Sequence, residues 1–399
     1  MSQPSRLASA NTFGNAIDRI TARQSQLASL QEQLSAGKRV LRPSDDPTGA
    51  AQAERAITRL SRVATDQRAL EVQRNAVAAA ESTLGDAVAA VQDFRELVVQ
   101  AGNSTLSTTD RASIAQRLSG LRDQLLGYAN ARDSNGQPLF GGLGSSAAPF
   151  SDRPGGVAYD GLAGQLAGND TAIPAVLDGQ SAWMNVPTGN GVFTVAQAAV
   201  GTSVWSDAGK VTQPAALTGH DYRIEFTIAG AATSYTVVDT TSNTTVQAAA
   251  PYVAGKPIEF DGLSLVANGT PASGEALLVK PSTRASLFGV LDQAIAQITA
   301  PSGGGGLSQG VAQALVQIDA GLSRLSSSRG QAGGLLNQVD DISDRQANRS
   351  VQLEADRSRA EDVDMVKAMS DFQAQQTAYS AALGSYAQIQ KLSLFNFIG

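Results

Sequence analysis

His220 is the first candidate for acid–base chemistry, because it is the one histidine of the chain. It stands beside Asp221 at the start of an alternating segment, and a histidine next to a carboxylate is part of a charge-relay triad. The triad also needs a serine nucleophile, and no nucleophile motif accompanies this pair. We therefore interpret His220 as a structural residue and expect no catalytic residues.

Metal and cofactor sites are equally poorly supported. The chain has no cysteine, which removes disulfides, thiolate nucleophiles and cysteine-based metal sites. Asp362 and Asp364 lack the glycine-punctuated spacing of a calcium loop, so we interpret them as part of a solvated helix face. Ser35 and Lys38 match a short Ser-x-x-Lys pattern without its companion motifs, and Gly37 lacks the upstream glycine of a phosphate loop. We expect neither metal nor cofactor.

Length and charge exclude several classes of partner. A chain of 399 residues is long enough for two or three domains. Its 30 basic and 36 acidic residues give a formal net charge of -6, and no run of Lys or Arg follows a phosphate backbone, so nucleic-acid binding is not expected. No stretch approaches the roughly 20 apolar residues of a membrane span, and residues 1–20 lack the apolar core of a cleavable signal peptide. These features predict a soluble cytoplasmic protein, or a secreted one with a signal-independent route.

Both ends of the chain carry residues at alternating steps of four and three, the spacing of a coiled-coil seam. The N-terminal series consists of Phe13, Ile17, Ile20, Gln24, Leu27, Gln31 and Leu34. The C-terminal series consists of Met365, Met369, Phe372, Gln376, Tyr379, Leu383, Tyr386 and Gln390. We expect the two ends to form a long antiparallel helical pair.

These terminal helices are thin, so pairing with each other buries little apolar area. At about 25 cal/mol per Å², that area does not readily offset an ordering cost of about 1 to 2 kcal/mol per residue. We therefore expect the ends to be mobile in a monomer and ordered in a polymer. For residues 47–130 and 311–355, the apolar positions favour a core within one chain.

Local signals predict where these helices begin and end. Gly37 suits the left-handed position after a helix, and Lys38 and Arg39 complement its C-terminal dipole. Asp46 before Pro47 predicts the cap and first residue of a second helix, which continues to about residue 100. Further along the chain, Ser107 and Asp110 resemble a capping box, a helix follows, and Asn135 with Gly136 predicts a tight turn.

Between residues 141 and 306 the composition changes to Gly, Thr, Asn and short alternating runs, which indicates a β-rich insertion. Residues 222–228 and 234–238 predict a hairpin, and further strands are expected at 258–260, 263–266 and 276–279. The stretch from Phe150 to Val211 is less regular; Trp183 and Trp205 are expected to anchor it, and we do not assign its strands. The glycines at 303–306 predict a flexible joint before the last helices.

The predicted fold is therefore mainly α with an inserted β domain, and both termini form a long antiparallel helical bundle or coiled coil. We divide the chain into terminal helices (1–42 with 358–399), a long-helix bundle (43–145 with 307–357) and a β-rich outer domain (146–306). Ser, Gln and Arg at seam positions weaken a coiled coil but restrict which neighbour fits. Such a surface suits specific lateral contacts, so the architecture indicates assembly.

Several of these segments resemble the bacterial flagellins and their hook-associated relatives. The N-terminal motif extends from Leu34 to Val40 and continues at 43–47, and its signature residues are Gly37, Lys38, Arg39, Pro43, Ser44, Asp45, Asp46 and Pro47. The C-terminal motifs lie at 361–364, 373–379 and 390–398. The resemblance covers about residues 5–145 and 310–398. It implies the flagellin-like arrangement of helices.

Three variants of these motifs resemble the hook-associated branch of the family. They are the Lys-Arg-Val form with Pro-Ser-Asp-Asp-Pro, the turn at 132–136 with 139–142, and the Leu-Ser-Leu-Phe ending at 392–395. The resemblance implies a structural subunit of the flagellum that joins the hook to the flagellin filament and is exported through the flagellar type III channel. It implies as partners another hook-associated protein on the hook side, flagellin on the filament side, further copies of this chain and an export chaperone.

The resemblance also implies that side chains of the terminal helices make the assembly contacts. The expected interface residues are Phe13, Ile17, Ile20, Leu27, Leu34, Met369, Phe372, Gln376, Tyr379, Leu383, Tyr386, Leu392, Leu394 and Phe395. Two alternatives stay open. The chain could be a filament flagellin, or it could bind a surface glycan or act as an enzyme through a pocket in the β domain.

Overall fold

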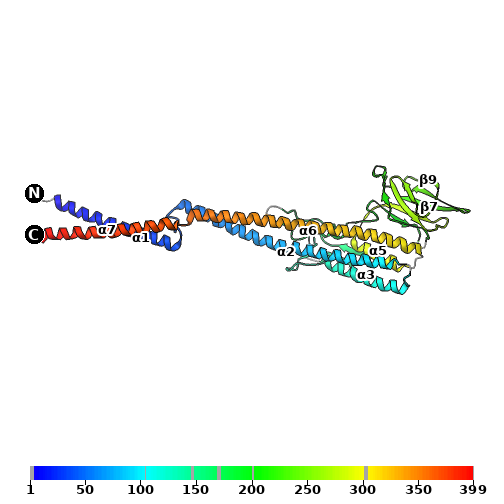
Figure 1. The fold of residues 1–399 in the computed structure, drawn as a ribbon, viewed down its shortest axis with the longest axis horizontal. Coiled ribbons are helices and arrows are strands. Elements are labelled where there is room, and N and C mark those ends of the chain that lie inside the picture. Colours follow the sequence, from blue (N-terminus) through cyan, green and yellow to red (C-terminus); the bar gives the residue numbers. More distant parts are fainter. Residues whose placement is uncertain are drawn as a thin grey trace. The chain divides into compact units, whose positions relative to one another are not determined.

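A computed structural model of the protein describes residues 4–103, 105–144, 148–168, 172–199, 202–300 and 304–398. The chain divides into two compact units, residues 1–68 with 343–399 and residues 69–342. Helices form most of the first unit, whereas the second adds the β-strands to its helices (Figure 1). The predicted class, mainly α with an inserted β domain, is confirmed.

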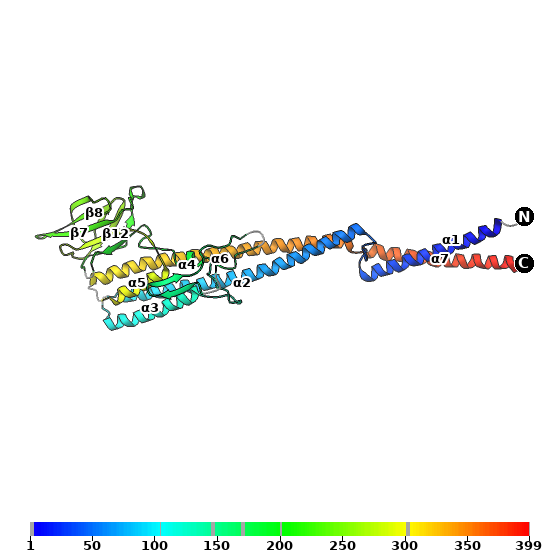
Figure 2. The ribbon, with the colours of Figure 1, turned by 180° about the vertical axis from the view of Figure 1, so that it is seen from behind.

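In the first unit, the two terminal helices lie side by side. Helix α1 (Pro4–Ala36) and helix α7 (Met365–Ile398) run antiparallel, with the N- and C-termini at the same end in both views (Figures 1 and 2). The beginning of α2 (Pro47–Ala101) and the end of α6 (Gly304–Glu361) also belong to this unit. The predicted antiparallel pairing of the chain ends is therefore confirmed.

Helices α2 and α6 each bury a column of side chains at every seventh residue, and Gln346 in α6 is the one polar member. In α2 the column consists of Ala56, Val63, Leu70, Val77, Leu84, Val91 and Val98. In α6 it consists of Ile318, Leu325, Ala332, Val339, Gln346, Leu353 and Ala360. Since side chains seven residues apart lie on one helix face, each helix presents one continuous stripe to its neighbours. The core within one chain that we expected for the inner helices is present.

The second unit completes its helical core with α3 (Thr108–Ala129) and α5 (Leu287–Thr299). The predicted capping box of α3 forms, because the Ser107 hydroxyl accepts the Asp110 N–H at 3.1 Å and the Asp110 carboxylate accepts the Ser107 N–H at 3.2 Å. Arg122 of α3 is buried and binds Asp292 of α5 at 3.0 Å as well as Asp152. One guanidinium therefore joins three elements of this unit.

Nine of the described strands form two sheets around a separate apolar core. The five-stranded sheet has the order β4 (Phe193–Gln197), β12 (Ala276–Pro281), β7 (Tyr222–Ala229), β8 (Ala232–Asp239) and β9 (Thr244–Pro251). The other contains β10 (Pro257–Phe260), β11 (Leu263–Asn268), β5 (Trp205–Ser206) and β6 (Lys210–Val211). The predicted hairpin is confirmed as β7–β8, in a register that pairs Tyr222 with Asp239.

The segment before this sandwich packs on the helices instead. Strands β1 (Phe150–Arg153) and β2 (Gly156–Tyr159) form a hairpin, followed by α4 (Gly179–Trp183) and by β3 (Val186–Pro187), which pairs with β13 (Arg284–Ala285). Trp183 is fully buried in the helical core and stacks on Phe288 of α5 at 5.9 Å between ring centroids. Trp183 thus anchors the stretch as expected, whereas Trp205 in β5 is only half-buried and is not part of the sandwich core, which begins at Phe193.

A glutamine fastens the sandwich to α6. Gln309 is 4% exposed; its amide nitrogen donates to the carbonyl of Val195 in β4 at 3.2 Å. Its amide oxygen accepts the Ser206 N–H of β5 at 2.6 Å. Gln313, one turn later, donates to the same Val195 carbonyl. Side-chain amides therefore bind the backbone of β4 where no strand does. Elsewhere in this domain, a short 3-10 turn, η1 (Pro214–Ala216), lies between β6 and β7.

Two expectations from local composition were wrong. Gly304, Gly305 and Gly306 form the first turn of α6, while Gly303 lies outside the described residues. Glycine costs a helix about 1 kcal/mol per residue, but here the following turn is buried at Leu307 and Gln309, so tertiary packing overrides propensity. Asp362 and Asp364 lie in the break between α6 and α7 rather than on a helix face. None of the described helices is both long and apolar enough to span a membrane.

Candidate assembly site: the joint and the terminal helices

The loop after α1 and the break before α7 meet in one structure, which we call the joint (residues 37–49 with 354–364). Helix α1 ends at Gly37, whose φ of +69° is the left-handed conformation that glycine adopts without strain. The N–H groups of Arg39 and Val40 donate to the Glu361 carbonyl at 2.7 and 3.2 Å, and the Val363 N–H returns to the Gly37 carbonyl at 3.1 Å. Backbone hydrogen bonds in both directions therefore connect the loop after α1 with the break before α7.

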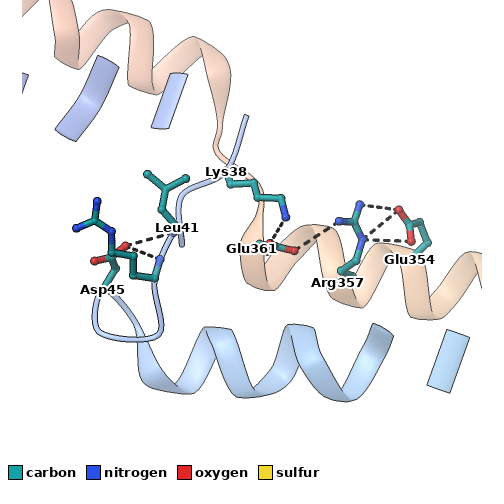
Figure 3. A network of polar contacts seen from close by, with 7 residues as sticks. Lys38, Leu41, Asp45, Glu354, Arg357 and Glu361 are labelled. Atoms are coloured by element: carbon teal, nitrogen blue, oxygen red, sulfur yellow. Dashed lines mark hydrogen bonds and ion pairs between the residues drawn. The ribbon is translucent and has the colours of Figure 1, made fainter. Parts of the chain in front are cut away.

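Side chains reinforce the joint (Figure 3). Lys38 forms an ion pair with Glu361, which also binds Arg357 at 3.5 Å. Arg357 in turn binds Glu354 at 2.7 Å, and this hydrogen bond is the main reason why its pKa is raised. Arg39 donates to the carbonyl of Ala360 at 2.8 Å. The signature residues Lys38 and Arg39 thus act on the end of α6, a role different from the dipole complement of α1 that we predicted.

The two signature carboxylates organise the turn into α2. Asp45 accepts the N–H groups of Leu41 and Arg42 at 3.2 and 2.9 Å (Figure 3). Asp46 caps α2 as predicted: it accepts the Gly49 N–H at 2.9 Å and the Thr48 hydroxyl at 2.7 Å. The Gly49 hydrogen bond, followed by those of Thr48 and Arg39, lowers the pKa of Asp46 to about 2. The carboxylate therefore stays ionised in any physiological medium.

Pro43 and Ser44 are exposed at the tip of this turn, and Pro47 is the first residue of α2, as predicted. Analysis of the sequence missed Gly49, Glu354 and Arg357. A Cβ added to Gly49 would lie 2.6 Å from the Asp46 carboxylate, so glycine is needed for the cap. The position of Gly49, two residues after Pro47 in the first turn of α2, could have suggested that this glycine serves the cap. Nothing local could have suggested Glu354 or Arg357, because their partners in the joint depend on the fold.

The terminal helices pair through a seam shifted from the predicted one. In each predicted series one heptad column is half-buried: Ile20, Leu27 and Leu34 in α1, and Phe372, Tyr379 and Tyr386 in α7. The second half-buried or buried column was not predicted, and it consists of Ala16, Arg23 and Leu30 with Ala368, Gln375 and Ala382. Met365, at the start of α7 in the column of Phe372, is 49% exposed and takes no part in the seam. The remaining predicted residues with described side chains, Ile17, Gln24 and Gln31 with Met369, Gln376 and Leu383, are exposed. We call these six residues the outward column.

The outward column leaves large apolar side chains in solvent. Ile17 is 49% exposed, Met369 47% and Leu383 41%. Within residues 14–36 and 365–388, whose side chains the structure describes, Ala368 alone is buried. The contact between α1 and α7 therefore buries only part of the apolar surface that their heptad positions offer. The side chains of Phe13, Gln390, Leu392, Leu394 and Phe395 lie outside the described ones.

The candidates for acid–base and metal chemistry take structural positions. His220 pairs with Asp239, not with Asp221, at 2.6 Å. Burial raises the pKa of Asp239, but hydrogen bonds from Ser242, His220 and Thr241 outweigh it and hold that pKa below its ordinary value. Asp364 accepts the N–H groups of the first turn of α7 at 3.0 and 3.1 Å. Among the described residues, no group of three or more His, Cys, Asp or Glu side chains is placed to hold a metal ion.

Comparison with known proteins places both ends of the chain in one family. Residues 9–145 match the bacterial flagellin N-terminal helical region, and residues 315–398 match the bacterial flagellin C-terminal helical region. These two ranges contain the joint and most of the paired terminal helices. Filament flagellins themselves match as more distant relatives.

Individual relatives match different lengths of the chain. The flagellar hook-associated protein 3 of Salmonella typhimurium is 43% identical over 139 residues, which is 34% of this chain and 43% of that protein. The flagellar hook-associated protein 3 of Escherichia coli is 27% identical over 384 residues, 94% of each chain. The crystal structure of hook-associated protein-3 from Legionella pneumophila is similar with a TM-score of 0.70 and 26% identity, over 76% of this chain and 97% of that one.

Proposed function

This chain belongs to the bacterial flagellin family, and we propose that it is the structural subunit of the flagellum that joins the hook to the flagellin filament. The observation that carries the proposal is the likeness to hook-associated protein 3 of Escherichia coli over 94% of both chains. The structural likeness to hook-associated protein-3 of Legionella pneumophila supports it, with a TM-score of 0.70. The family is a structural component of the flagellum, and we propose that this member is not an enzyme.

The terminal helices support an assembly role by what they leave exposed. Two heptad columns of each helix are half-buried or buried within the chain, whereas the outward column keeps Ile17, Met369 and Leu383 in solvent. Because burial of apolar area drives association, such a column gains free energy when a neighbour covers it. We propose that the outward column contacts neighbouring subunits and that the two inward columns of each helix hold α1 and α7 together.

The joint gives these helices a defined direction. Three backbone hydrogen bonds connect residues 37–40 with residues 361–363, so α1 and α7 leave it as a pair. We propose that residues 1–42 with 358–399 form the inner layer of the assembly, residues 43–145 with 307–357 the middle layer, and residues 146–306 the outer domain. This arrangement would present flagellin-like helices to the filament.

We propose four partners for this subunit: another hook-associated protein on the hook side, flagellin on the filament side, copies of itself, and an export chaperone before assembly. An exported subunit travels unfolded through the flagellar channel in this proposal, and thin terminal helices fit it because they gain most of their order from neighbours. A chaperone would cover the same apolar side chains that the assembly later buries. The mature protein would then be extracellular.

Immunogold electron microscopy of intact flagella tests the proposal. An antibody raised against the β sandwich, residues 193–281, should label a narrow band where the hook meets the filament. Cells that lack the gene should build hooks without filaments and release flagellin into the medium. Label along the whole filament would make the chain a filament flagellin and overturn the proposal. Absence of label from flagella would overturn it in favour of a glycan-binding or enzymatic role in the β domain.

A further inference from the structure

Helix α2 carries three arginines on one exposed face near its start. Arg55, Arg59 and Arg62 follow each other at spacings of four and three residues, so their side chains are neighbours, and all three are exposed. Like charges at this spacing destabilise a helix. In the part of the chain that the structure describes, none of the three forms an ion pair. We call these residues the arginine column.

Two residues of this column line a groove between α2 and α6. Arg55 and Arg59 line it from α2, and Asp356 and Arg359 line it from α6, around a volume of about 360 Å³. Arg359 is already paired with Asp356. Two guanidinium groups therefore face the groove without a carboxylate, and they are placed to bind an acidic surface.

The same helix carries a complementary column nearer its other end. Asp86, Asp93 and Glu96 are exposed on one face, and Asp93 and Glu96 line a groove of about 840 Å³ between α2 and α3. Arg117 lines this groove too, but no ion pair joins it to these carboxylates in the described structure. The nearby Arg95 is engaged with Asp319 at 2.7 Å. We call Asp86, Asp93 and Glu96 the carboxylate column.

We propose that the arginine column of one copy binds the carboxylate column of the next copy. The two columns lie at separate places on one continuous helix, so they cannot meet within a single chain. Opposite charges on different faces of one subunit give a heterologous contact, which repeats from copy to copy. This contact rests on the proposed function, since it forms only where copies assemble.

Charge complementarity of this kind sets register and suppresses wrong neighbours more than it adds affinity. An apolar outward column alone tolerates a shift by one heptad, because its residues repeat every seven positions. In each charged column two residues lie seven apart, Arg55 with Arg62 and Asp86 with Asp93, but Arg59 and Glu96 have no like-charged counterpart at that spacing, so a neighbour shifted by one heptad would leave part of the charges unpaired. The columns would therefore select one axial position for each added subunit.

Cross-linking between copies tests the contact directly, because the chain has no cysteine of its own. Gln52 lines the arginine groove and Gln100 lines the carboxylate groove, so Gln52→Cys with Gln100→Cys changes neither column. Treatment of purified flagella with a short bismaleimide should give dimers and higher multimers at least tenfold above either single variant. As a control, Gln52→Cys with Val99→Cys moves one thiol by about 100° around the helix and should stay at the single-variant level.

Charge exchange provides the second arm. Reversal of Arg55, Arg59 and Arg62 to Glu, or of Asp86, Asp93 and Glu96 to Lys, should reduce incorporation into flagella at least tenfold. The combined variant should recover to within about threefold of wild type. A control that reverses two other exposed arginines, Arg68→Glu with Arg349→Glu, should assemble normally.

The outcomes separate this contact from the proposed function. A chain that immunoblots detect in purified flagella, but that gives neither a multimer ladder nor rescue by charge exchange, would overturn the contact and leave the adaptor role intact. Normal assembly of the charge-reversed arginine variant would overturn it as well. Absence of the wild-type chain from purified flagella would instead reject the proposed function and the contact together.

Discussion

The backbone N–H of Arg39 donates a hydrogen bond to the Glu361 carbonyl at 2.7 Å, and this bond connects the loop after α1 with the last residue of α6. Lys38 adds an ion pair to the Glu361 carboxylate. The last turn of α6 is thereby a partner of the signature motif, although the two are far apart in the sequence. The direction of both terminal helices depends on this connection.

The stability of the turn at Gly37 should depend on the backbone conformation of this residue and not on the space around it. A Cβ there meets no atom within 4 Å, but φ is +69°, so Gly37→Ala should destabilise the joint by about 1 kcal/mol. We expect about fivefold faster hydrogen exchange at Val363, whose N–H donates to the Gly37 carbonyl. Gly14→Ala is the control. It also has open space but lies within α1, so it should leave exchange at Val363 unchanged.

Asp46 should make the start of α2 sensitive to acid. Its pKa is lowered from the ordinary 3.8 to about 2, so the ionised cap stabilises the folded state above pH 3.8 and that contribution is lost as the pH falls toward 2. Thr48→Val removes one of the hydrogen bonds and should move the pKa of Asp46 up toward 3.8. Carboxyl ¹³C NMR titration measures both values. An unchanged pKa in Thr48→Val would reject the hydroxyl as a cause of the shift.

Arg122 should matter more to stability than an exposed arginine with a similar partner. Arg122 is 7% exposed and contacts Asp152 and Asp292, so Arg122→Met leaves two carboxylates without their partner and should cost about 2 kcal/mol in the free energy of unfolding. Arg95→Met breaks the more exposed pair with Asp319 and should cost at most about 1 kcal/mol. Urea denaturation of the two variants decides the matter. Equal losses would contradict a special role for Arg122.

The outward column should separate assembly from folding. Leu383 is 41% exposed, so Leu383→Glu should leave the isolated protein folded and yet block incorporation into flagella. Phe372 is half-buried in the seam with α1, so Phe372→Glu should reduce helicity already in the isolated protein. Circular dichroism and immunoblots of purified flagella provide the two measurements. Normal incorporation of Leu383→Glu would show that the outward column is not an assembly surface.

Gln309 should hold the sandwich on α6. Gln309→Ala removes the acceptor of the buried Ser206 N–H and should cost about 1 to 3 kcal/mol, seen as faster hydrogen exchange at Ser206. Gln313→Ala removes a donor from the Val195 carbonyl but leaves Ser206 paired, so exchange at Ser206 should stay as in the wild type. If both variants exchange alike, the glutamine bridge is not what protects Ser206.

Much of the joint could be predicted, because its turns obey local rules. Gly37 after α1, the Asp46 cap and Pro47 at the start of α2 are all where their conformational preferences put them. The other half of the joint could not be predicted from these rules. Glu354, Arg357 and the break after Glu361 acquire their roles from residues far away in the sequence.

The sequence by itself determined much of the secondary structure and its periods, since backbone sterics and side-chain spacing act locally. It thus predicted the paired ends, the β7–β8 hairpin and the capping box of α3. It did not predict α5 within the range taken as β-rich or the glycine-rich first turn of α6. Tertiary structure alone decided which heptad column of the terminal helices turns inward, and that His220 pairs with Asp239 rather than Asp221. A period of seven marks a stripe but not the side on which a partner lies, because only packing between distant segments chooses between adjacent columns.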